Sequence, residues 1–149
     1  MPDLYINTLD GKERQITHTK DLWEIEPDWS AETGLIAYAG GESMGDLVIY
    51  LAGSDGSNVK QLTDDDLVNS GPNFSPDGKS IIFNRMDRSA DSSSIIKIDL
   101  NSGKEQVLMA DHNLNGYKPK YSPNGEYIVF LGSKKKAKKT DLFVMKADG

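Results

Sequence analysis

The sequence predicts an all-β fold built from repeated four-stranded antiparallel sheets. Two landmarks recur at one period along the 149 residues. Prolines that open an aromatic strand stand at Pro27, Pro72 and Pro119, at steps of 45 and 47 residues. Turn glycines repeat at steps of 45 to 47 residues; they are Gly11, Gly56, Gly103 and Gly149. Because two independent landmarks keep one period, the chain is an array of repeats, and a unit of this size is typical of a β-propeller blade.

Each repeat contains four short strands, which we label A to D. Strand A is the Pro-x-aromatic-Ser stretch, and strand B is an apolar alternation such as residues 80–83. Strand C is typified by residues 47–50, and strand D is shorter, as at residues 60–63. These apolar alternations of period two indicate strands rather than helices.

Turn residues separate the predicted strands. Ser-Pro-Asp-Gly at 75–78 and Ser-Pro-Asn-Gly at 122–125 join strands A and B, because proline fixes φ and glycine accepts a positive φ. Asp-Gly pairs at 10–11 and 55–56 mark hairpins between strands C and D. The first repeat has Ala-Glu-Thr-Gly at 31–34 in place of Pro-Asp-Gly, which changes the turn but leaves the strands in place.

Apolar residues of strands A and B are expected to form the core between blades. In strand A these are Trp29, Phe74 and Tyr121. In strand B they are Ile36, Ile82 and Val129.

The repeats divide the chain at roughly 1–26, 27–71, 72–118 and 119–149. The first segment holds only strands C and D, and the last holds A, B and C. Three blades per chain do not close a ring, because propellers usually have about four to eight blades. We therefore expect half of a six-bladed ring, completed by a second copy in a homodimer. The alternative is that the chain is a piece of a longer propeller or of a propeller-containing hydrolase.

Two segments compete for one strand position in such a ring. Residues 3–6 and residues 141–144 both read as strand C. One of them is expected to be displaced, and the C-terminal copy has the lower closure entropy because a short loop joins it to its blade.

Composition excludes several function classes. The chain is 37% hydrophobic and 27% charged, which excludes a disordered or membrane-embedded chain. The net charge of −6 argues against nucleic-acid binding. The absence of cysteine excludes thiolate metal sites. Without a secretory signal the chain as given is expected in the cytoplasm, or in the periplasm if a leader has been removed.

The phrase Pro-x-aromatic-Ser-Pro-Asp-Gly-Lys-x-Ile-x-Phe, at residues 72–83, resembles the WD-like repeat of TolB-type β-propellers. The preceding Gln-Leu-Thr at 61–63 fits the same repeat, and the resemblance covers essentially the whole chain. It implies a propeller, commonly six-bladed, with one of three roles. These are a Tol–Pal type adaptor, the lid of a prolyl-oligopeptidase-like hydrolase, or another binding module.

One motif of enzymes occurs, at Gly41-Glu42-Ser43-Met44-Gly45, which matches the G-x-S-x-G nucleophile elbow. That motif works on a bend from a strand to a helix, with a histidine and an acid nearby. Here it lies between strands B and C, so Ser43 is not expected to be a nucleophile.

The loops that lead from strand D to the next strand A carry the best candidate ligand-binding residues. In propellers these loops meet the B–C loops on one face, around the central channel. A ring of His, Asp and aromatic side chains there suits a ligand, a cation or a peptide, whereas solvated turns are the plainer interpretation. The candidates are His18, Trp23, Asp64, Asp65, Asp66, Asp111, His112 and Tyr117.

Other charged groups predict no defined site. The spacing of His and Asp fixes no metal geometry, so neither a metal nor another cofactor is expected. Five lysines within residues 134–139 are interpreted as a solvated loop, with contact to an acidic partner as the alternative.

The sequence therefore favours a non-enzymatic β-propeller scaffold that binds a protein, peptide or ligand through one face and its channel. The alternative is the propeller portion of a prolyl-oligopeptidase-like hydrolase, or a small propeller enzyme that uses His18 or His112.

Overall fold

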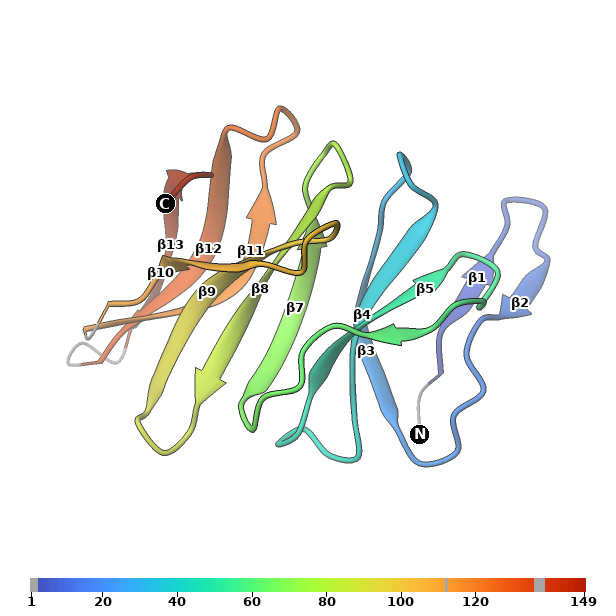
Figure 1. Cartoon of the computed structure of the whole chain (residues 1–149), viewed down its shortest axis with the longest axis horizontal. Helices are drawn as coiled ribbons and strands as arrows, with labels where there is room; N and C mark the ends of the chain where they lie inside the picture. The colour runs from blue at the N-terminus through green and yellow to red at the C-terminus, as the bar shows by residue number, and fades with distance from the viewer. Residues whose placement is uncertain (1–2, 112, 136–138) are drawn as a thin grey trace.

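The computed structural model describes residues 3–111, 113–135 and 139–149. Within these residues thirteen strands form four antiparallel sheets, and none of them forms a helix. Consequently this part of the chain holds no helix that is long and apolar enough to cross a membrane. Figure 1 shows the sheets following one another in chain order along the long axis, with the termini toward opposite ends. The all-β prediction is confirmed.

The four sheets contain two, four, four and three strands. The N-terminal hairpin consists of β1 (Tyr5–Asn7) and β2 (Glu13–Gln15). The first sheet consists of β3 (Trp23–Trp29), β4 (Leu35–Gly41), β5 (Val48–Gly53) and β6 (Lys60–Gln61). The second consists of β7 (Val68–Phe74), β8 (Ser80–Asp87), β9 (Ser92–Asp99) and β10 (Glu105–Met109). The third consists of β11 (Leu114–Tyr121), β12 (Tyr127–Lys134) and β13 (Lys139–Lys146).

Strand A is longer than the sequence predicts. In each sheet it begins four or five residues before the proline, so Trp23 and Tyr117, which we expected in loops, lie in β3 and β11. The sequence pattern does not reveal these earlier starts, because a β-bulge interrupts each strand at the proline. A bulge tolerates a residue that cannot donate to the ladder, so proline does not end the strand there.

Apolar side chains pack between consecutive sheets. One cluster joins the first and second sheets and includes Leu51, Phe74 and Phe83. Another joins the second and third sheets and includes Ile82 and Ile128. A smaller cluster joins the N-terminal hairpin to the first sheet. In it Leu4 and Ile16, which flank the hairpin strands, pack with Ile36, Tyr38 and Ala52. The core thus lies between sheets, as expected for stacked blades.

Two predicted core residues are exposed. Trp29 keeps 60% of its surface exposed and Val129 keeps 36%, whereas Phe74, Ile36 and Ile82 are buried. Tyr121 is half-buried. Trp29 and Val129 lie on the two faces that, among the described residues, have no complete neighbouring sheet. The prediction that Trp29 and Val129 are buried is therefore wrong, because it assumed a complete sheet on every side.

Candidate functional site

The first strands of the three larger sheets are β3, β7 and β11; β7 contacts each of the other two, and residues of all three strands line a groove. Its cavity has a volume of about 230 Å³. Two residues from each strand line it, and these six residues define the inner groove: Glu26, Pro27, Gly71, Pro72, Lys118 and Lys120. The groove therefore lies where all three repeats place the same bulge.

The bulge imposes an unusual backbone on the groove. Glu26, Gly71 and Lys118 have φ angles of 52°, 64° and 49°. Each directly precedes a proline, a position that normally favours an extended backbone with negative φ. Glycine accepts positive φ, but for glutamate and lysine it is uncommon and costs free energy. Strain of this kind is a reason to suspect a functional site, and here it falls on two charged residues of opposite sign.

Opposite charges meet across the groove. Lys118 Nζ lies 3.2 Å from Glu26 Oε1, and Lys120 Nζ lies 3.5 Å from Asp28 Oδ1. These pairs join β11 to β3 over the intervening β7, where Gly71 has no side chain to obstruct them. A Cβ atom at Gly71 would lie 3.1 Å from Asn84 Oδ1 and 3.8 Å from Glu26 Oε2.

A ladder of polar side chains fixes the three strands relative to one another. Asp28 Oδ2 accepts hydrogen bonds from Asn73 Nδ2 at 3.0 Å and from the Phe74 amide at 2.8 Å. Asn73 Oδ1 in turn accepts from the Tyr121 amide at 2.7 Å. The same strand position thus links each sheet to the next, and it holds the Asp28 carboxylate at the groove.

A buried carboxylate lies further along β3. Glu24 is 3% exposed and accepts hydrogen bonds from the hydroxyls of Thr17 and Thr19, the latter at 2.9 Å. Burial raises the pKa of Tyr38, and the charge of Glu24 adds to that rise. Because its hydrogen bonds tie the loop after β2 to β3, Glu24 has a structural role.

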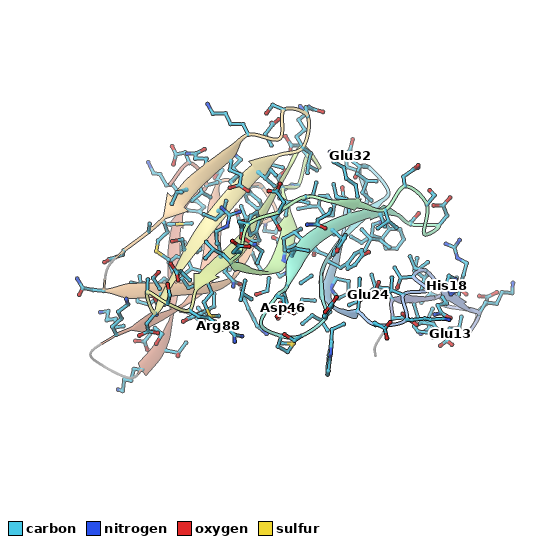
Figure 2. All side chains as sticks on the ribbon, turned by 60° about the horizontal axis from the view of Figure 1, so that its bottom comes forward. Glu13, His18, Glu24, Glu32, Asp46 and Arg88 are labelled. Carbon is cyan, nitrogen blue, oxygen red and sulfur yellow. The ribbon has the colours of Figure 1, made fainter. Side chains whose placement is uncertain are left out.

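The structure distributes the predicted ligand-binding residues over several places. His18 is exposed, and Figure 2 shows it near Glu13 at the hairpin end of the molecule. Asp64 and Asp66 are exposed in the loop between β6 and β7. Asp111 is exposed, and its Oδ1 accepts from the amide of Asn113 at 2.8 Å. His112 lies outside the described residues.

The two aromatic candidates are strand residues. Trp23 is 38% exposed at the start of β3, and Tyr117 is half-buried opposite Leu131 in the β11–β12 register. Loops of the two expected kinds do meet at the third sheet, where the Lys135 amide donates to the Asn113 carbonyl at 3.1 Å. The ligand-binding role of this set stays a prediction.

Asp65 is engaged within the fold. Its Oδ2 lies 2.7 Å from Arg85 Nη2, and its Oδ1 accepts from Asn69 Nδ2 at 2.9 Å. The Arg85 guanidinium also forms two bonds to Glu105, at 2.6 and 2.8 Å, and stacks over the Phe83 ring. Sequence reasoning missed this arginine cluster, because its members come from three different segments.

The G-x-S-x-G motif has no catalytic surroundings within the described residues. It lies between β4 and β5, so the turn joins two strands rather than a strand and a helix. Ser43 Oγ donates to the Asp46 carboxylate, and the Gly45 amide donates to Ser43 Oγ at 3.0 Å. Figure 2 shows Asp46 and His18 at separate places on the molecule. These contacts are those of a polar turn.

Metal-ligating side chains do not gather in the described part of the chain, where no group of three or more His, Asp or Glu could hold an ion. The lysine run is only partly described. Lys134, Lys135 and Lys139 are exposed, and residues 136–138 lie outside the described residues.

Comparison with known proteins identifies the repeat. The family model described as PD40, TolB β-propeller domain, matches residues 1–149. The Tol-Pal system protein TolB of Geobacter sulfurreducens is 39% identical over 71 residues, which cover 46% of this chain and 16% of that protein.

Solved structures share the fold. The putative TolB of Agrobacterium tumefaciens superimposes with a TM-score of 0.82 at 21% identity, covering 99% of this chain and 53% of that one. TolB of Acinetobacter baumannii gives a TM-score of 0.75 at 22% identity, covering 97% and 35%. An acylaminoacyl peptidase is less similar, with a TM-score of 0.66 at 17% identity, covering 86% and 24%. The chain thus spans about half or less of the length of each of these proteins.

Proposed function

We propose that this chain, which belongs to the TolB β-propeller domain family, is a binding scaffold without enzymatic activity that holds a protein or peptide segment in its inner groove. The observation that carries the proposal is the meeting of strained, oppositely charged residues at one repeated bulge. Glu26 and Lys118 keep an unfavourable backbone at the groove, although glycine occupies the same position in β7. A purely structural bulge has no need of charged residues there.

The chemistry of the groove favours a peptide over a single ion. Glu26 from β3 and two lysines from β11 line one small cavity, and Asp28 of β3 pairs with one of those lysines at its edge. A peptide with both acidic and basic side chains can pair with each of them. An ion of one sign would leave the opposite charges without compensation.

The sheets support a wider binding face. We propose that the three larger sheets are three blades of a six-bladed arrangement, with β3, β7 and β11 along its central channel. The loops that carry His18, Asp64 and Asp111 would then form the rim of that channel. Trp23 and Tyr117 would line the channel wall close to that rim. By the relationship to TolB of a Tol-Pal system, a protein is the proposed kind of partner.

A second candidate function is that of a propeller portion of a peptidase, which the similarity to acylaminoacyl peptidase favours. Labelling with a fluorophosphonate probe tests whether this chain itself carries a reactive serine. The scaffold proposal expects no labelling of Ser43, whose hydroxyl is bound to Asp46. Stoichiometric labelling of Ser43 would establish a reactive serine and overturn the non-enzymatic role.

Selection from a phage library of random 12-residue peptides tests the groove. We expect the wild-type chain to enrich peptides that contain both acidic and basic residues. The double variant Glu26→Gln/Lys118→Gln is expected to lose that enrichment, because it removes one charge of each sign. The matched control Glu13→Gln/Lys104→Gln changes the same charges at exposed positions outside the groove, and it should select as the wild type does. Enrichment that survives the groove variant would contradict the assignment.

A further inference from the structure

The outer face of the third sheet has the side chains of a buried face. The registers Ala39↔Ile49, Asn84↔Ile95 and Leu131↔Leu142 place three apolar residues at one position of strand C. Ile49 and Ile95 are each 0% exposed, because the next sheet covers them, whereas Leu142 is 74% exposed. Val144 and Val129, which pair across β12 and β13, are also exposed, so the face is an apolar surface without a cover in the described chain.

The first sheet presents the matching half of such a contact. Phe74 is 6% exposed, because it belongs to the apolar cluster that also contains Ala37 and Leu51 of the preceding sheet. Trp29 has the same position in β3 but is 60% exposed. The hairpin in front of it supplies only two strands, which correspond to C and D. The strand that carries Phe74, β7, contacts β3, β4 and β5, so Trp29 lacks the counterparts of β3 and β4. Val129 occupies the position of Ala37 on the uncovered third sheet.

The charges on the inner strands at the two ends of the sheet array are also complementary. Along the inner strands, β3 carries Glu26 and Asp28, β7 carries Gly71 and Asn73, and β11 carries Lys118 and Lys120; these residues form two sets of three equivalent positions, one before and one after the repeated proline. The charge thus passes from acidic to neutral to basic along the arc. Wherever β11 of one arc lies beside β3 of another, opposite charges face each other.

We propose that a second copy of this chain covers the two uncovered faces. The third sheet of each copy then packs on the first sheet of the other, which gives two equivalent interfaces, here called seams, about a two-fold axis. The proposal rests on the proposed propeller arrangement. In each seam Trp29 of one copy packs on Val129 of the other, and the acidic β3 lies beside the basic β11.

One strand changes partners in the seam. Leu4, which directly precedes β1, occupies the same place relative to strand D as Ile49 does. The Leu4 amide donates to Thr17 Oγ1 and the Ile49 amide to Thr63 Oγ1, each at 2.9 Å. Leu4 and Leu142 therefore compete for one position. β13 pairs with β12 over eight residues, whereas β1 pairs with β2 over three. The better-paired β13 takes the position, and Leu142 of one copy replaces Leu4 on the first sheet of the other.

Sedimentation equilibrium of the full chain tests the proposal. We expect about twice the chain mass of 16.4 kDa at micromolar concentration. Trp29→Glu and Leu142→Glu should each raise the dimer dissociation constant at least about 30-fold, as loss of a central apolar anchor does. Leu4→Ser should lower it, because it weakens the competing strand. The control Val107→Glu alters a residue that is 58% exposed on the outer strand of the second sheet, and it should leave the constant unchanged.

The outcomes are distinct. Far-ultraviolet circular dichroism of Trp29→Glu and Leu142→Glu should retain the β-sheet signal of the wild type, so loss of mass reports dissociation. A wild-type chain that remains at 16.4 kDa at 100 µM, or that forms open-ended polymers, would overturn the two-copy ring. A dissociation constant that the two seam variants leave unchanged would overturn it as well. None of these variants alters a charged residue of the inner groove. The mass measurement can therefore contradict the dimer without contradicting the proposed peptide binding, and peptide selection can do the reverse.

Discussion

The second and third sheets have the same repeat and the same turns, but they differ in burial. The same hydrogen bond closes the A–B turn in both sheets. The Ser75 amide donates to the Ser80 carbonyl and the Ser122 amide to the Tyr127 carbonyl, each at 2.8 Å. The second sheet is covered on both faces, whereas the third is covered only on the face toward the second. The comparison teaches that strands and turns are encoded within a repeat, but that burial depends on the neighbouring repeat.

The largest expected effect concerns strand A. Phe74→Ala should lower the free energy of unfolding by about 3–5 kcal/mol, because it leaves a cavity between two sheets. Trp29→Ala, at the same strand position, should change it by less than about 0.5 kcal/mol in the dissociated chain. Urea unfolding at concentrations below dimer formation measures both. Equal losses would mean that Trp29 is buried in the isolated chain, which would end the comparison.

Strand C gives the next effect. Ile95→Ala should cost about 2–5 kcal/mol, since Ile95 is fully buried between the second and third sheets. Leu142→Ala, its counterpart on the uncovered face, should cost about 0.5 kcal/mol or less under the same dilute conditions. Thermal unfolding followed by circular dichroism at several protein concentrations checks the pair. A cost at Leu142 that grows with concentration would show that its face is covered in the assembly.

Substitutions at the equivalent bulges of the two sheets are expected to change stability in opposite directions. Gly71→Ala in the second sheet should lower the free energy of unfolding by about 1–2 kcal/mol, because a side chain there must adopt positive φ. Lys118→Gly in the third sheet relieves the same backbone strain, while it removes an exposed ion pair worth less than about 1 kcal/mol. We expect it to be neutral or stabilising by up to about 1 kcal/mol. Chemical denaturation of both variants provides the measurement, and a loss above 1 kcal/mol in Lys118→Gly would contradict the strain argument.

The smallest effect is a pH dependence that differs between the A–B turns. Hydrogen bonds from the Ser75 hydroxyl and the Lys79 amide hold the pKa of Asp77 below its ordinary value of 3.8. A lowered folded-state pKa stabilises the turn above pH 3.8, and that contribution is lost as the pH falls through the lowered value. The third sheet has Asn124 in the same place, with the same bond from Ser122 at 2.7 Å, and no proton to gain. Asp77→Asn should therefore flatten the acid limb of stability, measured by urea unfolding between pH 2 and 5. An unchanged acid limb would assign the pH dependence to other carboxyl groups.

Much of the fold was predictable because its determinants are local. The Ser-Pro-Asp-Gly and Ser-Pro-Asn-Gly turns and the alternation of strands B and C are visible in short windows of sequence. The start of strand A was not, because Trp23 and Tyr117 precede a bulge that looks like a strand end. The burial of Trp29 and Val129 failed for another reason, since it depends on sheets that the pattern assumes on every side.

The candidate site shows the same limit. Residues His18, Asp64 and Asp111 were recognisable as exposed polar groups in equivalent loops. The inner groove was missed, because Glu26 and Lys118 are separated by two repeats and are brought together by strand contact. One signal was present in the sequence. The residue before each repeated proline is glutamate, glycine and lysine in turn, and that reversal of charge at one position marks the groove.

The ion pair between Lys118 and Glu26 has a consequence for the selectivity of the proposed groove. The two charges compensate each other across Gly71 when no peptide is bound. Exposed ion pairs of this kind contribute little and open readily. Under the proposed peptide binding, a bound segment would have to pair with both residues that it separates, because each would otherwise lose its counter-charge. A segment that carries one acidic and one basic side chain would meet this requirement, whereas a segment with charges of one sign would not.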